Sequence, residues 1–100
     1  MTEPLRLTSR ARADLRSIGR FTLKTWGRRQ RDAYLEAIHR RFCWLAEDPR
    51  RGRARPDIRE GYHSYPEGAH MIFYLVREGG IDILGVPHQA MDVAAHLGSR

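Results

Sequence analysis

The sequence predicts an α+β fold in which a helical hairpin packs on a small antiparallel sheet, formed by a single domain over residues 1–100. Apolar residues recur at helical spacing only in the first half of the chain. In the second half, two apolar runs, Met71–Val76 and Ile81–Val86, flank Arg77-Glu78-Gly79-Gly80, which is typical of a β-hairpin. We therefore expect the order β-α-α-β-β-β, followed by a short C-terminal helical tail.

The first half is predicted to contain one short strand and two helices. Leu5-Arg6-Leu7 forms the strand, and Thr8 or Ser9 can cap the first helix, which Gly27 ends. A second helix runs from about Arg28 to Asp48, and a single glycine between the two helices requires them to fold back on each other. The apolar faces comprise Ala11, Leu15, Ile18, Thr22 and Trp26 in the first helix, and Tyr34, Ile38, Phe42 and Leu45 in the second.

The second half is predicted to form an antiparallel meander of three strands. Residues 50–55 form a basic connector, Ile58–Tyr65 a moderate strand, and Pro66-Glu67-Gly68 a turn. Met71–Val76 is apolar on both faces, which suits a central strand. Because no other element can bury the sheet, the helical hairpin must cover one of its faces.

Charge is distributed unevenly along the chain. Residues 1–56 hold 15 lysines and arginines against 6 acidic residues, whereas residues 57–100 hold 3 against 6. A basic surface attracts nucleic acid, anionic lipid or an acidic protein, and charge alone does not choose among them. Residues 50–55 hold four arginines without interleaved aromatic residues, so we expect no recognition of single strands by stacking and no sequence-specific nucleic-acid binding.

Composition excludes several classes of protein. No apolar run approaches the ~20 residues of a membrane span, and the N-terminus lacks the pattern of a signal peptide, so a cytoplasmic location is expected. The single Cys43 rules out an internal disulfide and a cysteine zinc cluster. His63 and His70 are the only close histidine pair, and no carboxylate spacing completes a ligand set, so we expect no metal and no cofactor.

Six short motifs follow one another at characteristic spacing. They are Leu7-Thr8 with Ala11-x-x-Asp14-Leu15-x-x-Ile18; Trp26-Gly27-x-x-Gln30-x-x-x-Tyr34; Leu45-Ala46-x-x-Pro49-x-x-Gly52-Arg53; Ile58-Arg59-x-Gly61-Tyr62; His70-x-Ile72-Phe73-Tyr74; and His88-x-x-Met91-Asp92-x-x-x-His96-Leu97. Over roughly residues 5–97 the chain thereby resembles the ParE branch of the RelE/ParE toxin superfamily. These are the toxins of bacterial toxin–antitoxin modules.

The resemblance implies a partner and a target. The partner is a ParD-like antitoxin encoded nearby, whose C-terminal part wraps the toxin in a hetero-oligomer. The target is DNA gyrase, which the toxin traps on cleaved DNA. A toxin of this kind inhibits by binding, so the resemblance implies no catalytic residues.

A second reading is a ribosome-dependent mRNA interferase of the RelE type. Such an enzyme needs a base, an acid and cations that converge on the sheet, and Arg59 and His88 would form a minimal pair if they converged. Two features oppose this reading: no tyrosine follows Val86, and Gly85 stands where many relatives place an arginine. A third reading is an inert member that only binds its antitoxin.

The candidate antitoxin surface lies on the helical hairpin and the connector. An amphipathic antitoxin helix would dock over Leu15, Trp26 and Trp44, rimmed by arginines such as Arg41 and Arg53. Alternatively, Trp44 is simply part of the core.

The candidate target surface is the C-terminal tail, with His88, Met91, Asp92 and His96. Alternatively, His88 caps the last strand or donates to a backbone carbonyl, and Met91 and Leu97 pack against the sheet edge.

Overall fold

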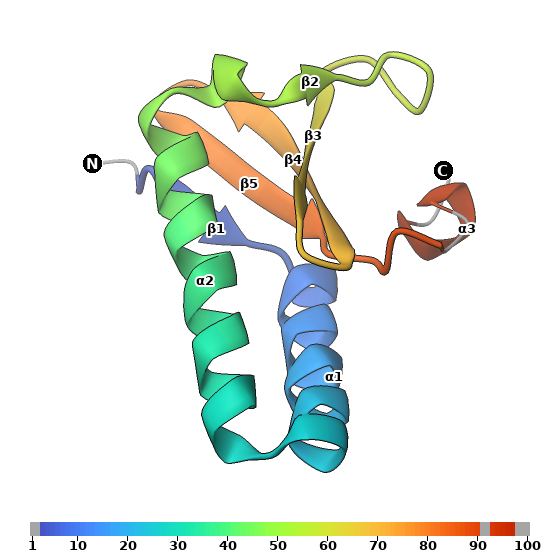
Figure 1. Ribbon diagram of the computed structural model, residues 1–100. Helices are drawn as coiled ribbons and strands as arrows, with labels where there is room; N and C mark the ends of the chain where they lie inside the picture. The colour runs from blue at the N-terminus through green and yellow to red at the C-terminus, as the bar shows by residue number, and fades with distance from the viewer. Residues whose placement is uncertain (1–2, 91–92, 98–100) are drawn as a thin grey trace.

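Two helices cover one face of a five-stranded sheet in the computed structural model, which describes residues 3–90 and 93–97 (Figure 1). The predicted α+β class is confirmed. The elements are β1 (Leu5–Leu7), α1 (Ser9–Trp26), α2 (Arg28–Glu47), a 3-10 turn η1 (Pro49–Arg51), β2 (Arg53–Ala54), β3 (Tyr62–Glu67), β4 (His70–Arg77), β5 (Gly80–Gly85) and the five-residue helical segment α3 (Val93–Leu97).

The sheet is mixed, which corrects the prediction of an antiparallel sheet. Its strand order is β1-β5-β4-β3-β2, and the predicted meander of β3, β4 and β5 is antiparallel. However, β1 lies parallel to β5, with Leu5 opposite Ile81. Gly80 permits this close pairing, because a Cβ there would lie 2.1 Å from the carbonyl oxygen of Pro4. Since the two strands are far apart in sequence, no local pattern could indicate their direction.

The basic connector is part of the sheet rather than a free loop. Tyr74 is fully buried, and its hydroxyl donates to the carbonyl of Pro49 at 2.7 Å. Gly52 lies against the same ring, where a Cβ would come within 2.1 Å of the hydroxyl oxygen. The chain is thus held on the sheet as η1 and then β2, a fifth strand of two residues that is too short to leave a sequence pattern.

The third strand begins and ends later than the sequence indicated. Residues 55–61 form turns, in which the amides of Ile58 and Arg59 both donate to the carbonyl of Arg55, so the predicted start of the strand at Ile58 is wrong. Pro66 lies inside β3 and not in a turn. A proline is tolerated there because β2 pairs only with His63 and Ser64, which leaves the end of β3 as a sheet edge.

The core lies between the helical hairpin and the sheet. Its fully buried side chains include Ile38, Phe42 and Leu45 of α2, packed on residues such as Ile72 and Tyr74 of β4. These α2 residues are the ones that the helical spacing predicted. None of the described helices is long and apolar enough to cross a membrane.

Trp26 does not join this core, although it falls on the predicted apolar face of α1. Its side chain is 68% exposed, and that of Phe21 is 66% exposed. The turn between α1 and α2 lies well away from the sheet (Figure 1). The sheet therefore covers the beginning of α1 and leaves its end open.

Candidate functional site

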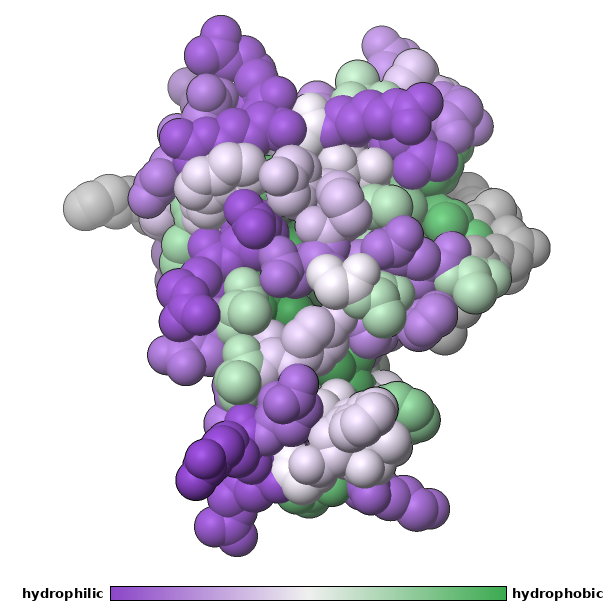
Figure 2. Space-filling view, viewed as in Figure 1, coloured by the Kyte–Doolittle hydropathy of each residue, from purple (hydrophilic) through white to green (hydrophobic). Residues whose placement is uncertain are grey.

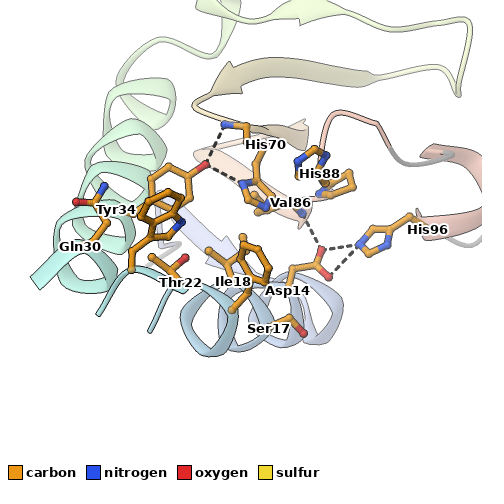
Figure 3. A pocket seen from close by; sticks show the side chains of 14 residues that line it. Asp14, Ser17, Ile18, Thr22, Gln30, Tyr34, His70, Val86, His88 and His96 are labelled. Carbon is orange, nitrogen blue, oxygen red and sulfur yellow. Dashed lines mark hydrogen bonds and ion pairs between the residues drawn. The ribbon is translucent and has the colours of Figure 1, made fainter. Parts of the chain in front are cut away.

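A groove of about 610 Å³ opens between the helical hairpin and one end of the sheet (Figure 3). Side chains of α1 and α2 form one wall, and the β3–β4 turn and the segment after β5 form the other. The lining is largely apolar, and the exposed rings of Phe21 and Trp26 belong to it. In the space-filling view, apolar side chains lie recessed between the two helices, with hydrophilic ones around them (Figure 2).

Asp14 joins three elements at one end of the groove. Its carboxylate accepts the amide N–H of Val86 at 2.7 Å and contacts Nε2 of His96 at 2.8 Å (Figure 3). The side chain faces the sheet from the first turns of α1, and Asp14 is only 8% exposed. A buried carboxylate requires such partners, because an unpaired charge in the interior is costly. One side chain thereby holds α1, the end of β5 and α3 together.

Gly85 provides the space for this arrangement. A Cβ at Gly85 would lie 2.7 Å from a methyl group of Leu97 and 3.2 Å from a carboxylate oxygen of Asp14. A side chain at this position would require the Leu97 side chain to shift and would crowd the carboxylate of Asp14. The helical segment therefore occupies the volume that a larger residue at the end of β5 would need.

Tyr34 links α2 to the β3–β4 turn on the other wall. Its hydroxyl donates to the carbonyl of Glu67 at 3.0 Å and accepts the amide of Ala69 at 3.2 Å. Nδ1 of His70 lies 2.7 Å from the same oxygen. The direction of this hydrogen bond follows from the tautomer of the His70 ring.

Burial lowers the pKa of His70, and the neighbouring His88 lowers it further. The two rings meet edge to face at 5.4 Å between centroids, and the backbones of the two residues form an isolated β-bridge. Burial also raises the pKa of Tyr34, and the nearby carboxylate of Glu67 contributes to this shift. Both groups are thus favoured in their neutral forms, which suits an apolar wall rather than a charged one.

Comparison with known proteins assigns the chain to a family. Residues 5–93 match the family model for the ParE toxin of the type II toxin–antitoxin system parDE. This chain is a member of the ParE toxin family. It is 35% identical over 96 residues to toxin ParE1 of Caulobacter vibrioides, covering 96% of this chain and 99% of the relative. It is 40% identical over 92 residues to toxin ParE1 of Mycobacterium tuberculosis, covering 91% and 94%.

Solved structures share the fold of this ParE-family toxin. A chain of the chromosomal ParDE toxin–antitoxin system from P. aeruginosa superposes with a TM-score of 0.73 at 21% identity, covering 84% of this chain and 92% of that one. A chain of the toxin–antitoxin complex RelBE2 from Mycobacterium tuberculosis gives 0.62 at 23% identity, covering 87% and 91%. At these identities the likeness concerns the fold alone.

The predicted antitoxin residues of the ParE-family toxin lie on separate surfaces. Trp26 lines the groove, but Leu15 lies in a different depression between the helices. Arg41 and Trp44 line a third depression on the outer side of α2. Arg53 lies in β2 at the sheet edge. The structure therefore does not bring these five residues together.

Trp44 has structural partners that account for its position. It packs against the core, and the guanidinium groups of Arg41 and Arg51 each lie 4.6 Å from its ring centroid. Arg41 also pairs with Glu67 at 2.8 Å. Tyr65 meets the ring at its edge. Trp44 is thus a partly buried residue whose ring contacts two cations.

The predicted target residues include two that line the groove. His88 is exposed, and its Nδ1 accepts the amide of Ala90 at 3.2 Å, so its local hydrogen bond is made to a backbone N–H and not to a backbone carbonyl. His96 lies beside Asp14. Met91 and Asp92 lie outside the described residues.

Two further residues belong to the site, Phe21 and Asp14. The sequence did not indicate Phe21, because it falls just off the apolar face of α1, and it did not indicate the role of Asp14.

Arg59 and His88, the pair of the mRNA interferase reading, lie at opposite ends of a strand pair. The carbonyl of Arg59 binds the amide of Tyr62, at the start of β3. His88 bridges His70, which pairs with Glu67 at the end of β3. Tyr62 and Glu67 are five residues apart along β3, or about 16 Å of strand, so Arg59 and His88 lie near opposite ends of β3.

Carboxylates accompany several cations on the sheet face opposite the helices. Asp82 binds Arg6 at 3.0 Å and Arg77 at 2.6 Å, and the Arg6 and Arg77 guanidinium groups hold its pKa below the usual range. Arg55 pairs with Asp57 at 3.0 Å. Among the described residues, no group of three histidine, cysteine or acidic side chains is placed to hold a metal ion.

Replacing Asp14 by alanine should destabilise the fold more than replacing His96 by alanine. Asp14→Ala removes the acceptor of a buried amide and should lower the free energy of unfolding by about 1–3 kcal/mol. His96→Ala leaves the hydrogen bond from Val86 to Asp14 in place, so it should lower the free energy of unfolding by clearly less than Asp14→Ala does. Denaturant unfolding of both variants measures the difference. Equal losses would contradict the role of Asp14 as the common tie.

The titration of His70 should have its midpoint below 6.5, the ordinary value for histidine. Because the unfolded chain binds the proton more readily, this group should reduce stability as the pH falls from 6.5 through the folded-state pKa. NMR of the ring protons measures the midpoint. His88→Ala should raise the His70 midpoint, because it removes one of the groups that lower the His70 pKa. His39→Ala, at an exposed position on α2, should leave the His70 midpoint unchanged. A wild-type midpoint at or above 6.5 would refute the assignment.

Proposed function

We propose that this ParE-family protein is the toxin of a cytoplasmic module, inhibits DNA gyrase by binding, and is neutralised by a ParD-like antitoxin that docks in the groove. One observation carries the antitoxin site: two aromatic rings at the groove are 66% and 68% exposed. They are Phe21 and Trp26. Large apolar side chains gathered beside an apolar groove are typical of protein-binding surfaces.

The shape and lining of the groove favour an amphipathic helix as the antitoxin segment. Ile18 and Val86 form part of an apolar floor, and the two exposed rings stand at positions where a helix can insert its own apolar side chains. Aromatic residues at the centre of an interface commonly carry much of its binding energy. The half of the chain that forms both helices is net basic, which would attract an acidic antitoxin tail at long range.

Removing either ring should weaken antitoxin binding without unfolding the toxin. We expect Phe21→Ala and Trp26→Ala each to raise the Kd for the ParD-like antitoxin by about 30-fold or more, as for interface hot spots. Because both rings are largely exposed, the free energy of unfolding should change by less than about 0.5 kcal/mol. Calorimetry with purified antitoxin and denaturant unfolding measure the two quantities.

Leu23→Ala is the matched control for these variants. Leu23 is 42% exposed on α1 but lines the depression that also holds Leu15, and not the groove. Its removal should leave the antitoxin Kd within about twofold, since contacts outside the hot spots are nearly neutral. If the Leu23 variant loses as much affinity as the Trp26 variant, the antitoxin does not use the groove.

Three features support inhibition by binding over RNA cleavage. The Arg59 and His88 backbones are separated by the length of β3, whereas acid–base chemistry needs groups within hydrogen-bond reach of one substrate. Arg6, Arg55 and Arg77 are paired with carboxylates, which reduces their capacity to stabilise a developing phosphorane charge. Gly85 has no side chain, so this position at the end of β5 supplies no further cation.

Parallel assays on the two targets separate the readings. Purified toxin should inhibit gyrase supercoiling and increase gyrase-linked DNA cleavage, and it should leave a defined mRNA intact on translating ribosomes. Addition of the antitoxin should reverse the gyrase effect. Cleaved mRNA with unaffected gyrase would establish the interferase instead. Inactivity in both assays would indicate a member that only binds its antitoxin.

A further inference from the structure

A line of cations runs along α1 on the side away from the groove. This line, the basic ridge, consists of Arg12, Arg16, Arg20 and Lys24. All four residues are exposed. Successive members are four residues apart, so they follow one another along the helix at steps of about 6 Å and span about 18 Å. On the helical projection the ridge is centred roughly 160° from the groove-lining residues of α1. A ligand in the groove would therefore leave the ridge uncovered.

The charge of the basic ridge is not balanced within the described structure. The only acidic residue of α1 is Asp14, which is buried and engaged with Val86 and His96. No described carboxylate forms an ion pair with a ridge residue, and Arg20 alone has a side-chain hydrogen bond, to Ser17 at 3.3 Å. Like charges four residues apart on a helix each cost about 0.2–0.5 kcal/mol. The ridge is thus a locally unfavourable arrangement in the free protein.

Most arginines elsewhere in the described chain have an acidic partner. On α2, Arg31, Arg40 and Arg41 each pair with a carboxylate. Near the sheet, the same holds for Arg6, Arg50, Arg51, Arg55 and Arg77. Arg28, Arg29 and Arg53 have no described ion pair either, but only α1 carries four such cations in succession at helical spacing.

We propose that the basic ridge binds the phosphate backbone of duplex DNA, without reading its sequence. One strand of a duplex presents a phosphate every ~3.4 Å along its axis, so a line of cations about 18 Å long can meet several of them. The ridge contains no aromatic side chain that would stack on bases, and cations that follow one another along a helix suit the phosphates of a strand, which carry no sequence information. Contact with DNA would place cations opposite phosphates and relieve the repulsion along α1.

An acidic protein segment is the competing ligand, and the composition of the ridge disfavours it. Protein interfaces have a core that is depleted in charge and enriched in aromatic residues. The four ridge positions supply charge at every step. Leu15 and Leu23 border Arg16 and Arg20 in a depression between the helices, but the exposed aromatic rings of α1 line the groove on the opposite side. A polyanion of regular spacing satisfies the ridge better than a segment that also needs apolar contacts.

Binding of the full-length free toxin to a mixed-sequence DNA duplex tests the proposal. Fluorescence anisotropy should show weak binding that is independent of sequence, with log K falling against log salt at a slope of about −3.6 for four phosphate contacts. The double variant Arg12→Gln/Arg16→Gln should lower the affinity at least tenfold at ~0.1 M salt and reduce the slope by about 1.8.

The matched control is Arg40→Gln/Arg50→Gln, which removes the same net charge. Both arginines are exposed, and each is paired with a carboxylate. This control should change DNA affinity by less than about threefold, since exposed paired charges add little. Trp26→Ala, in the groove, should leave DNA binding unchanged. If the ridge double variant and the control double variant lose the same DNA affinity, the proposal is overturned, because net charge alone would then explain binding.

A glutamate-rich peptide of matched charge distinguishes the two kinds of ligand. If the toxin binds this peptide through the ridge but shows no measurable affinity for DNA, the ridge serves an acidic protein and the proposal fails. The ridge variants should unfold at the same temperature as the wild type or slightly above it. Because these assays contain only toxin and DNA or peptide, their result does not depend on whether gyrase is the target.

Discussion

The hydrogen bonds of Asp14 are the constraint on which the site depends. Its carboxylate lies where α1, the end of β5 and α3 meet, and it is almost fully buried. Without an acceptor there, the amide of Val86 would be an unpaired donor inside the protein, which is costly. Gly85 allows this contact because it adds no side chain between Asp14 and Leu97. The wall of the groove after β5 thus follows from one carboxylate and one glycine.

The molecule separates an apolar surface from a charged one by using opposite sides of α1. The groove side carries exposed rings and neutral polar groups, including a His70 whose pKa is lowered by burial. The other side carries four cations without described acidic partners. A single amphipathic helix can therefore present two surfaces of different chemistry. An antitoxin in the groove and DNA on the ridge would not compete for the same atoms.

Local patterns predicted most of the elements. The helical spacing of Ile38, Phe42 and Leu45 identified the buried face of α2, and Gly27 marked the turn between the helices, where its φ is 94°. The apolar runs identified β4 and β5, and the motifs identified the family. Prediction failed where the signal was too short or too distant in sequence: β2 has only two residues, and the parallel pairing of β1 with β5 joins the two ends of the chain.

The sequence by itself determined the helices, the meander, the charge asymmetry and the family, because each depends on residue type and spacing. Only the tertiary structure decided which apolar residues stay exposed. Trp26 has the spacing of a core residue but lies past the sheet, whereas Trp44 is enclosed by Arg41, Arg51 and Tyr65. Burial depends on what the rest of the chain places opposite a side chain, and helical periodicity carries no information about that.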